Sequence, residues 1–205
     1  DLAHEKKPKI QALLGEKAGQ QLYRYARGLD DSPVKMKPDE AKGFSLETTF
    51  NDDLVSMEQA LPILLEQCDV LAARMRRKKK KCTCISVTFR TLDFQNRSHQ
   101  MKLKNATDIT DEIYFHARKL FEESWRGQPL RLLGVSLTGL TDDSFEQLSF
   151  FEDTREKERR QKLDAALDSI RLKYGNDKVT RASIMNSTAR IGRKAKAQME
   201  NEREQ

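Results

Sequence analysis

Cysteine, histidine and long apolar runs are scarce in this sequence, and each shortage excludes a class of protein. There are three cysteines and three histidines in 205 residues, and Cys82 and Cys84 form a lone C-x-C motif. A structural zinc site needs four such ligands in paired clusters, so we expect no metal site and reduced thiols. No stretch approaches the run of about 20 apolar residues that crosses a membrane, and no apolar leader is visible. We therefore expect a cytoplasmic protein without a membrane partner.

The motifs of catalysis are also missing. The nine glycines are dispersed and form no phosphate-binding loop. No serine or cysteine stands in a convincing arrangement with histidine and aspartate. The adjacent acidic pairs all fall in turn-like stretches, where aspartate is common for local reasons: Asp30–Asp31, Asp52–Asp53 and Asp142–Asp143. We therefore predict no catalytic residues and no cofactor for this chain.

Charge, by contrast, is abundant. Lys and Arg number 38 against 32 Asp and Glu, which gives a net charge of +6, while hydrophobic residues still reach 37%. Seven of the eight residues from Arg74 to Lys81 are Lys or Arg. Such a run can be the solvated end of a helix, since cations suit a helix C-terminus. It can equally attract nucleic acid through the phosphates.

Alternation and helical spacing predict an α+β domain with the element order β-α-β-β-α-β. Apolar residues alternate with polar ones in four segments and recur at helical spacing in two. We expect a four-stranded, antiparallel-type sheet with both helices on one face, flanked by helical segments. The predicted strands cover residues 43–50, 85–90, 98–104 and 133–138, and the predicted helices cover 57–75 and 109–121.

Two helices on one face leave the other face of the sheet uncovered. Its outward positions are small, hydroxylated or basic, and Glu47 is the one acidic residue among them. Hydroxyls and cations suit DNA phosphates, and the absence of aromatics from this face disfavours stacking on single strands. Arg131 shares the alternation of the inward Leu133, so it must reach DNA from the edge of the sheet. The predicted DNA-binding residues are Gly43, Ser45, Thr49, Arg74, Arg76, Arg77, Thr88, Arg90, Arg97, Ser98, Lys102, Lys104, Arg131 and Ser136.

A short apolar peptide follows the last predicted strand in an acidic context. It can be a segment that packs under the domain, or a linear peptide that inserts its large side chains into a groove on a partner. Its residues are Gln147, Leu148, Ser149, Phe150 and Phe151.

Four stretches of the sequence resemble the Y-family translesion DNA polymerases, in the branch of polymerase IV and UmuC-like proteins. Residues 28–34 (GLDDSPV) are similar to the end of that family's thumb, and residues 42–50 (KGFSLETTF) to the first strand of its little-finger domain. Residues 130–135 (LRLLGV) look like its last strand, and residues 147–151 look like its clamp-binding pentapeptide. That pentapeptide more often has Leu at its fourth position, where this chain has Phe150.

The resemblance implies a domain organisation and a function. It implies the end of a helical thumb and a linker at 1–38, a little-finger DNA-binding domain at 42–141, and a clamp-binding peptide with a charged helical tail at 142–205. The family's catalytic palm, which would hold Mg²⁺, has no counterpart here, so the chain should be an inactive fragment of an error-prone DNA polymerase. The implied partners are double-stranded or primer-template DNA and the bacterial sliding clamp, in DNA repair and damage tolerance.

Two other classes of function remain open on the residues alone. The chain can be a stand-alone, non-catalytic nucleic-acid-binding protein, or a protein-interaction module whose basic sheet face is incidental. Beyond residue 152 the family resemblance explains nothing. There, apolar residues at helical spacing predict an amphipathic helix: Leu163, Ala166, Leu167, Ile170 and Tyr174.

Overall fold

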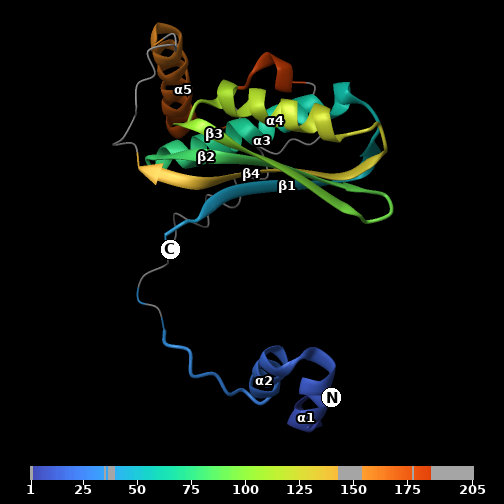
Figure 1. Cartoon of the computed structure of the whole chain (residues 1–205). Helices are drawn as coiled ribbons and strands as arrows, with labels where there is room; N and C mark the ends of the chain where they lie inside the picture. Colours follow the sequence, from blue (N-terminus) through green and yellow to red (C-terminus); the bar gives the residue numbers. More distant parts are fainter. Residues whose placement is uncertain (1, 35, 37–39, 143–153, 177, 186–205) are drawn as a thin grey trace. The chain divides into compact units, whose positions relative to one another are not determined.

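The structure is a computed structural model that describes residues 2–34, 36, 40–142, 154–176 and 178–185. The chain forms two compact units, Asp1–Glu40 and Ala41–Gln205. Figure 1 shows the helices of the first unit and the sheet and helices of the second. Within the described residues, no helix is both long enough and apolar enough to cross a membrane.

The N-terminal unit is a pair of short helices. A 3-10 turn at Leu2–His4 precedes α1 (Lys7–Leu14) and α2 (Glu16–Tyr25). Gly15 joins the two helices with φ +83°, a left-handed conformation that glycine adopts without steric penalty. Gly19 lets α2 approach α1 closely, because a Cβ there would lie 2.6 Å from Cα of Gln11. Ile10 is the buried apolar residue between them.

The second unit is built on a four-stranded sheet in which every neighbouring pair is antiparallel. The strands are β1 (Gly43–Leu54), β2 (Lys80–Thr91), β3 (Asn96–Thr107) and β4 (Leu130–Asp142), in the spatial order β1-β4-β2-β3. The predicted α+β class and strand arrangement are therefore confirmed. The strands are longer than predicted, because pairing continues into the polar residues at their ends.

Two helices, α3 (Met57–Arg77) and α4 (Thr110–Ser124), cover one face of the sheet (Figure 1). Ser56 begins α3 by accepting a hydrogen bond from the backbone N–H of Gln59 at 3.3 Å, and the Gln59 side chain accepts one from the Val55 N–H at 2.9 Å. Pro62 lies inside the helix, in its second turn. The core forms where the helical stripes meet the inward strand residues, among them Leu64, Leu71, Ile85, Val87, Phe89, Ile113, Phe121, Leu133 and Leu137.

The predicted C-terminal helix is present as α5 (Thr154–Tyr174), followed by a 3-10 turn at Ala182–Ile184. The predicted apolar residues of α5, however, do not form the buried side of the helix. Leu163 is 50% exposed and Tyr174 is 58% exposed, whereas Asp164 and Arg171 are buried. The helix packs through charged side chains because its partners on α3 and α4 are themselves charged, as the ion pairs described below show.

Candidate nucleic-acid interface

The uncovered face of the sheet, here called the open face, carries its side chains in rows across the four strands. The antiparallel register sets which residues stand beside one another. In the order β1, β4, β2, β3 the rows are Gly43–Thr138–Cys84–Lys102, Ser45–Ser136–Ser86–Gln100, Glu47–Gly134–Thr88–Ser98 and Thr49–Leu132–Arg90–Asn96. The structure thus brings together most of the residues predicted for DNA binding, and places Lys104 further along β3.

Hydroxyl groups occupy the middle of the open face and hold one another in place. The Ser98 hydroxyl lies 3.1 Å from that of Ser86 and accepts a hydrogen bond from the Thr88 hydroxyl at 3.1 Å. Ser98 is exposed, and Ser86 and Thr88 are partly exposed. These short side chains leave a low surface with oriented donors, which suits close approach of a phosphate backbone.

Cations stand along the β2–β3 side of the open face. The Arg90 guanidinium donates to the amide oxygen of Asn96 at 2.6 Å, which holds it along the edge strand. Lys102 and Lys104 are exposed on β3. The acidic Glu47 lies at the opposite edge, across Gly134, where a Cβ would meet its Cγ at 2.5 Å. The positive charge of the face is therefore concentrated over two strands.

Arg131 is placed by an irregularity in β4. Thr91 pairs with Leu130 and Arg90 with Leu132, so Arg131 is an extra residue between two register positions, as in a β-bulge. The bulge breaks the alternation from which the sequence prediction placed Arg131 on the inward side. Leu132, before which the bulge falls, keeps the outward alternation of Gly134 and Ser136, although it is 5% exposed. The Arg131 guanidinium lies 5.4 Å from the centre of the Phe94 ring.

Four predicted DNA-binding residues lie apart from the open face. Arg97 pairs in register with the inward Phe89, so it lies on the helix-covered side of β3. Arg74, Arg76 and Arg77 form the last turn of α3. The position of these three arginines at a helix end agrees with the sequence pattern, but a run of like charges does not show which of its members have structural partners.

Arg76 is held in an ion-pair network, here called the α5 dock. Its side chain is 12% exposed and lies 2.7 Å from the Asp168 carboxylate and 3.2 Å from that of Asp164, both on α5. It also donates to the backbone oxygen of Asp108 at 2.7 Å. Its guanidinium is therefore committed to joining α3 to α5, which argues against the predicted contact with DNA.

The α5 dock continues to the far end of the helix. Arg171 lies 2.7 Å from Asp69 of α3 with both side chains nearly inaccessible, and Arg181 lies 2.6 Å from Asp111 of α4.

Elsewhere in the basic run, Lys80 pairs with Asp142 at 2.6 Å and Lys81 is buried. Within the run, Arg76 and Lys80 are therefore held in ion pairs, Lys81 is buried, Arg74 is partly buried, and positions 77–79 are exposed.

The open face also contains one thiol, which is not among the predicted DNA-binding residues. Cys84 stands in a row with Lys102 and is partly exposed, although its alternation with Ser86 predicted that position. Burial raises the pKa of the Cys82 thiol to about 12 and also raises the pKa of Cys68. Among the described residues, no cluster of three or more His, Cys, Asp or Glu side chains could hold a metal ion.

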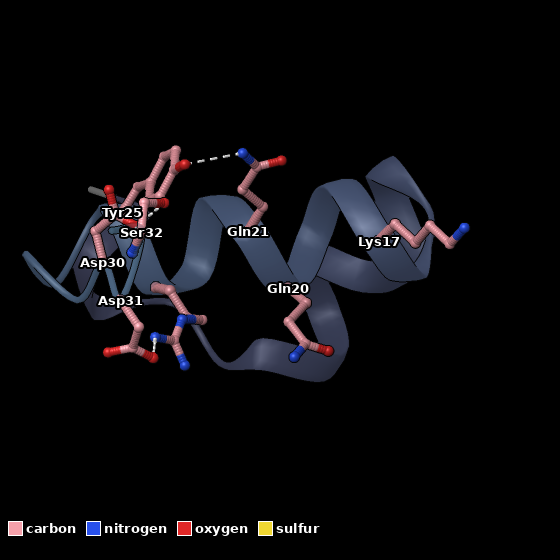
Figure 2. Close-up of a pocket in the computed structure, with 8 residues that line it drawn as sticks. Lys17, Gln20, Gln21, Tyr25, Asp30, Asp31 and Ser32 are labelled. Carbon is pink, nitrogen blue, oxygen red and sulfur yellow. Dashed lines mark hydrogen bonds and ion pairs between the residues drawn. The ribbon is translucent and has the colours of Figure 1, made fainter. Parts of the chain in front are cut away.

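The N-terminal unit has a polar hollow of about 540 Å³ of its own (Figure 2). The Gln21 amide donates to the Tyr25 hydroxyl at 3.0 Å, and Arg24 pairs with Asp31. Asp30 accepts from the Ser32 hydroxyl at 2.6 Å, and this hydrogen bond lowers the pKa of Asp30. These contacts join the end of α2 to residues 30–32, and they pair six of the eight side chains that line the hollow with one another.

Comparison with known proteins identifies the class of this chain. The C-terminal domain of the impB/mucB/samB family matches residues 41–150, which is more than half of the chain. The chain belongs to this family and is a C-terminal region of the Y-family polymerase type, as its motifs predicted.

The curated relatives carry a more particular name. A DNA polymerase IV of Clostridium acetobutylicum is 44% identical over 167 residues, which cover 82% of this chain and 42% of the relative. A DNA polymerase IV of Alkaliphilus oremlandii is 38% identical over 197 residues, covering 90% and 48%. The chain thus spans less than half the length of these relatives.

Proposed function

We propose that this chain is the DNA-gripping region of an error-prone, translesion DNA polymerase, and that its open face holds the backbone of primer-template DNA. The observation that carries the proposal is the set of cross-strand rows, in which small hydroxyl side chains adjoin Arg90 and Lys102, with Lys104 exposed further along β3. Such a surface can approach phosphates closely without reading base edges. Binding should therefore be nearly independent of sequence and steeply dependent on salt.

The salt dependence gives a quantitative test. Each phosphate neutralised contributes about −0.9 to the slope of log affinity against log salt concentration. Replacing Arg90 and Lys102 together by glutamine should lower the affinity for duplex DNA and flatten that slope by about 2. The matched control is Arg118→Gln with Lys119→Gln, two exposed cations on the helix-covered side. Equal slopes for the open-face variant and the unmodified chain would contradict the proposal.

We also propose that residues 147–151 tether the chain to a sliding clamp. These residues lie outside the described part of the structure, so the proposal rests on the sequence: Leu148, Phe150 and Phe151 would fill a groove, and Gln147 would fix the register. Buried anchors of this kind contribute about 2 kcal/mol or more apiece. Replacing Phe150 and Phe151 by alanine should abolish clamp capture and leave thermal unfolding and DNA binding unchanged. A lower melting temperature with capture intact would support the packing alternative instead.

The catalytic step belongs, in this proposal, to a palm domain elsewhere in the parent polymerase. The chain spans less than half of its relatives, which agrees with a part that grips DNA while another part holds Mg²⁺ and nucleotide. The role of this chain is then to keep the primer terminus in place. We expect no site for a metal or cofactor in the chain itself.

A further inference from the structure

The hairpin between β2 and β3 ends in an exposed aromatic ring. Phe94 is 65% exposed at this tip, and the neighbouring Leu92 is 50% exposed. Figure 1 shows the hairpin extending at one end of the sheet. This end carries the row that contains Arg90, so the ring adjoins the cationic side of the open face.

The backbone of the hairpin fixes the position of this ring. Phe94 has φ +61°, a left-handed conformation that is unusual for a bulky side chain. Its N–H donates to the Thr91 oxygen at 3.1 Å, the Thr91 N–H donates to the Gln95 oxygen at 3.2 Å, and the Thr91 hydroxyl donates to the Asp93 carboxylate. The turn therefore holds an apolar ring in solvent in a conformation that glycine or asparagine would adopt more readily. Such outliers occur preferentially at functional sites.

A cation from another strand stands beside the same ring. The Arg131 guanidinium lies 5.4 Å from the Phe94 ring centre, and the β4 bulge places Arg131 at this end of the sheet. Aromatic rings and guanidinium planes are the two side-chain surfaces on which unpaired bases stack. Bases within a duplex cannot reach them, because both of their faces are already stacked.

We propose that Phe94 and Arg131 form a stacking site for an unpaired base at the end of the duplex held on the open face. This inference rests on the proposed function, because it needs a duplex on the sheet that ends near the hairpin. A primer-template supplies both parts: paired DNA for the hydroxyl rows, and a single-stranded template extension for the ring. Phe94 thus provides, at the hairpin end of the sheet, the aromatic surface that the open face itself lacks.

The test compares two probes, a blunt duplex and the same duplex with a short 5′ extension on one strand, by fluorescence anisotropy. Stacking on an aromatic side chain should make the unmodified chain bind the extended probe about 5- to 150-fold more tightly than the blunt one. Phe94→Ala should remove this difference without changing the affinity for the blunt duplex. Phe94→Tyr, which keeps the ring, should retain it, and Arg131→Gln should reduce it.

The matched control is Phe115→Ala, because Phe115 is 64% exposed but belongs to α4 on the helix-covered side. It should bind both probes as the unmodified chain does. If Phe94→Ala keeps the preference for the extended probe, or weakens both probes equally, the stacking site is refuted while duplex binding by the sheet stands. If the unmodified chain does not bind the blunt duplex, the proposed function itself fails.

Discussion

Replacing Asp164 by alanine should detach α5 from the sheet unit. The Asp164 carboxylate is nearly inaccessible and accepts three hydrogen bonds from three separate segments. They come from the Thr110 backbone N–H at 2.8 Å, from Arg76 at 3.2 Å and from Arg181 at 3.1 Å. The first of these contacts satisfies a free N–H at the start of α4, where Ile109 has no side-chain cap to offer.

These contacts determine how much free energy of unfolding Asp164→Ala should lose. Removing one partner of a buried ion pair costs about 3–5 kcal/mol, because the remaining charge stays buried. While α5 stays docked, Arg76 keeps Asp168 at 2.7 Å and Arg181 keeps Asp111 at 2.6 Å. Where α5 detaches, Arg76 loses Asp168 as well, but water then solvates its guanidinium. We therefore expect Asp164→Ala to lower the free energy of unfolding by about 3 kcal/mol, the low end of that range. Asp164→Asn keeps an acceptor for the Thr110 N–H, so it should lose less stability than Asp164→Ala.

Urea unfolding of the full chain measures the free energy, and limited proteolysis within residues 154–174 measures the detachment of α5. The matched control is Leu163→Ala, since Leu163 is the neighbouring residue on the same helix and is 50% exposed. It should change stability by no more than about 0.5 kcal/mol. If Asp164→Ala leaves both measurements unchanged, or Leu163→Ala matches its loss, the charged network does not hold α5.

Three further outcomes are expected. Cys84 should react with iodoacetamide in the folded chain and be protected by bound duplex DNA, whereas Cys82, with its pKa raised to about 12, should stay unreactive. Burial lowers the pKa of His116 from 6.5, so thermal stability should fall as the pH drops below about 6.5, and His116→Gln should remove that slope. Primed template with Mg²⁺ and nucleotides should stay unextended, and extension by a pure preparation would contradict the fragment assignment.

The sheet and its two covering helices could be predicted because their signals are local. Ile85, Val87 and Phe89 alternate with polar residues, and all three are fully buried on the side that faces the helices. Ser56 stands three residues before Gln59, the local spacing of a capping box, and it begins α3. The outward rows follow from the same alternation, so the composition of the open face was also readable from the sequence.

The bulge and the α5 dock could not be predicted in this way, because each depends on residues far apart in the chain. Arg131 becomes an extra residue only through the pairing of β4 with Arg90 and Thr91. The partners of Arg76 lie on a helix that begins more than 70 positions later, and no local pattern distinguishes a paired arginine from a solvated one. For the same reason the apolar spacing of α5 predicted the helix but not its buried side.

The strand order β1-β4-β2-β3 has a consequence for how the chain folds during synthesis. The last strand to be made, β4, is an internal one, and it is the sole sheet neighbour of β1. Until residue 142 has been made, β2 and β3 can pair, but β1 and the apolar side of α3 lack Leu133, Val135 and Leu137 of the core. The sheet is therefore completed by contacts between residues far apart in the sequence, and such contacts form slowly. During that time the incomplete chain exposes apolar surface and is prone to aggregation. A chain that stops within β4 should lose the whole unit, whereas one that stops after it should lose only α5.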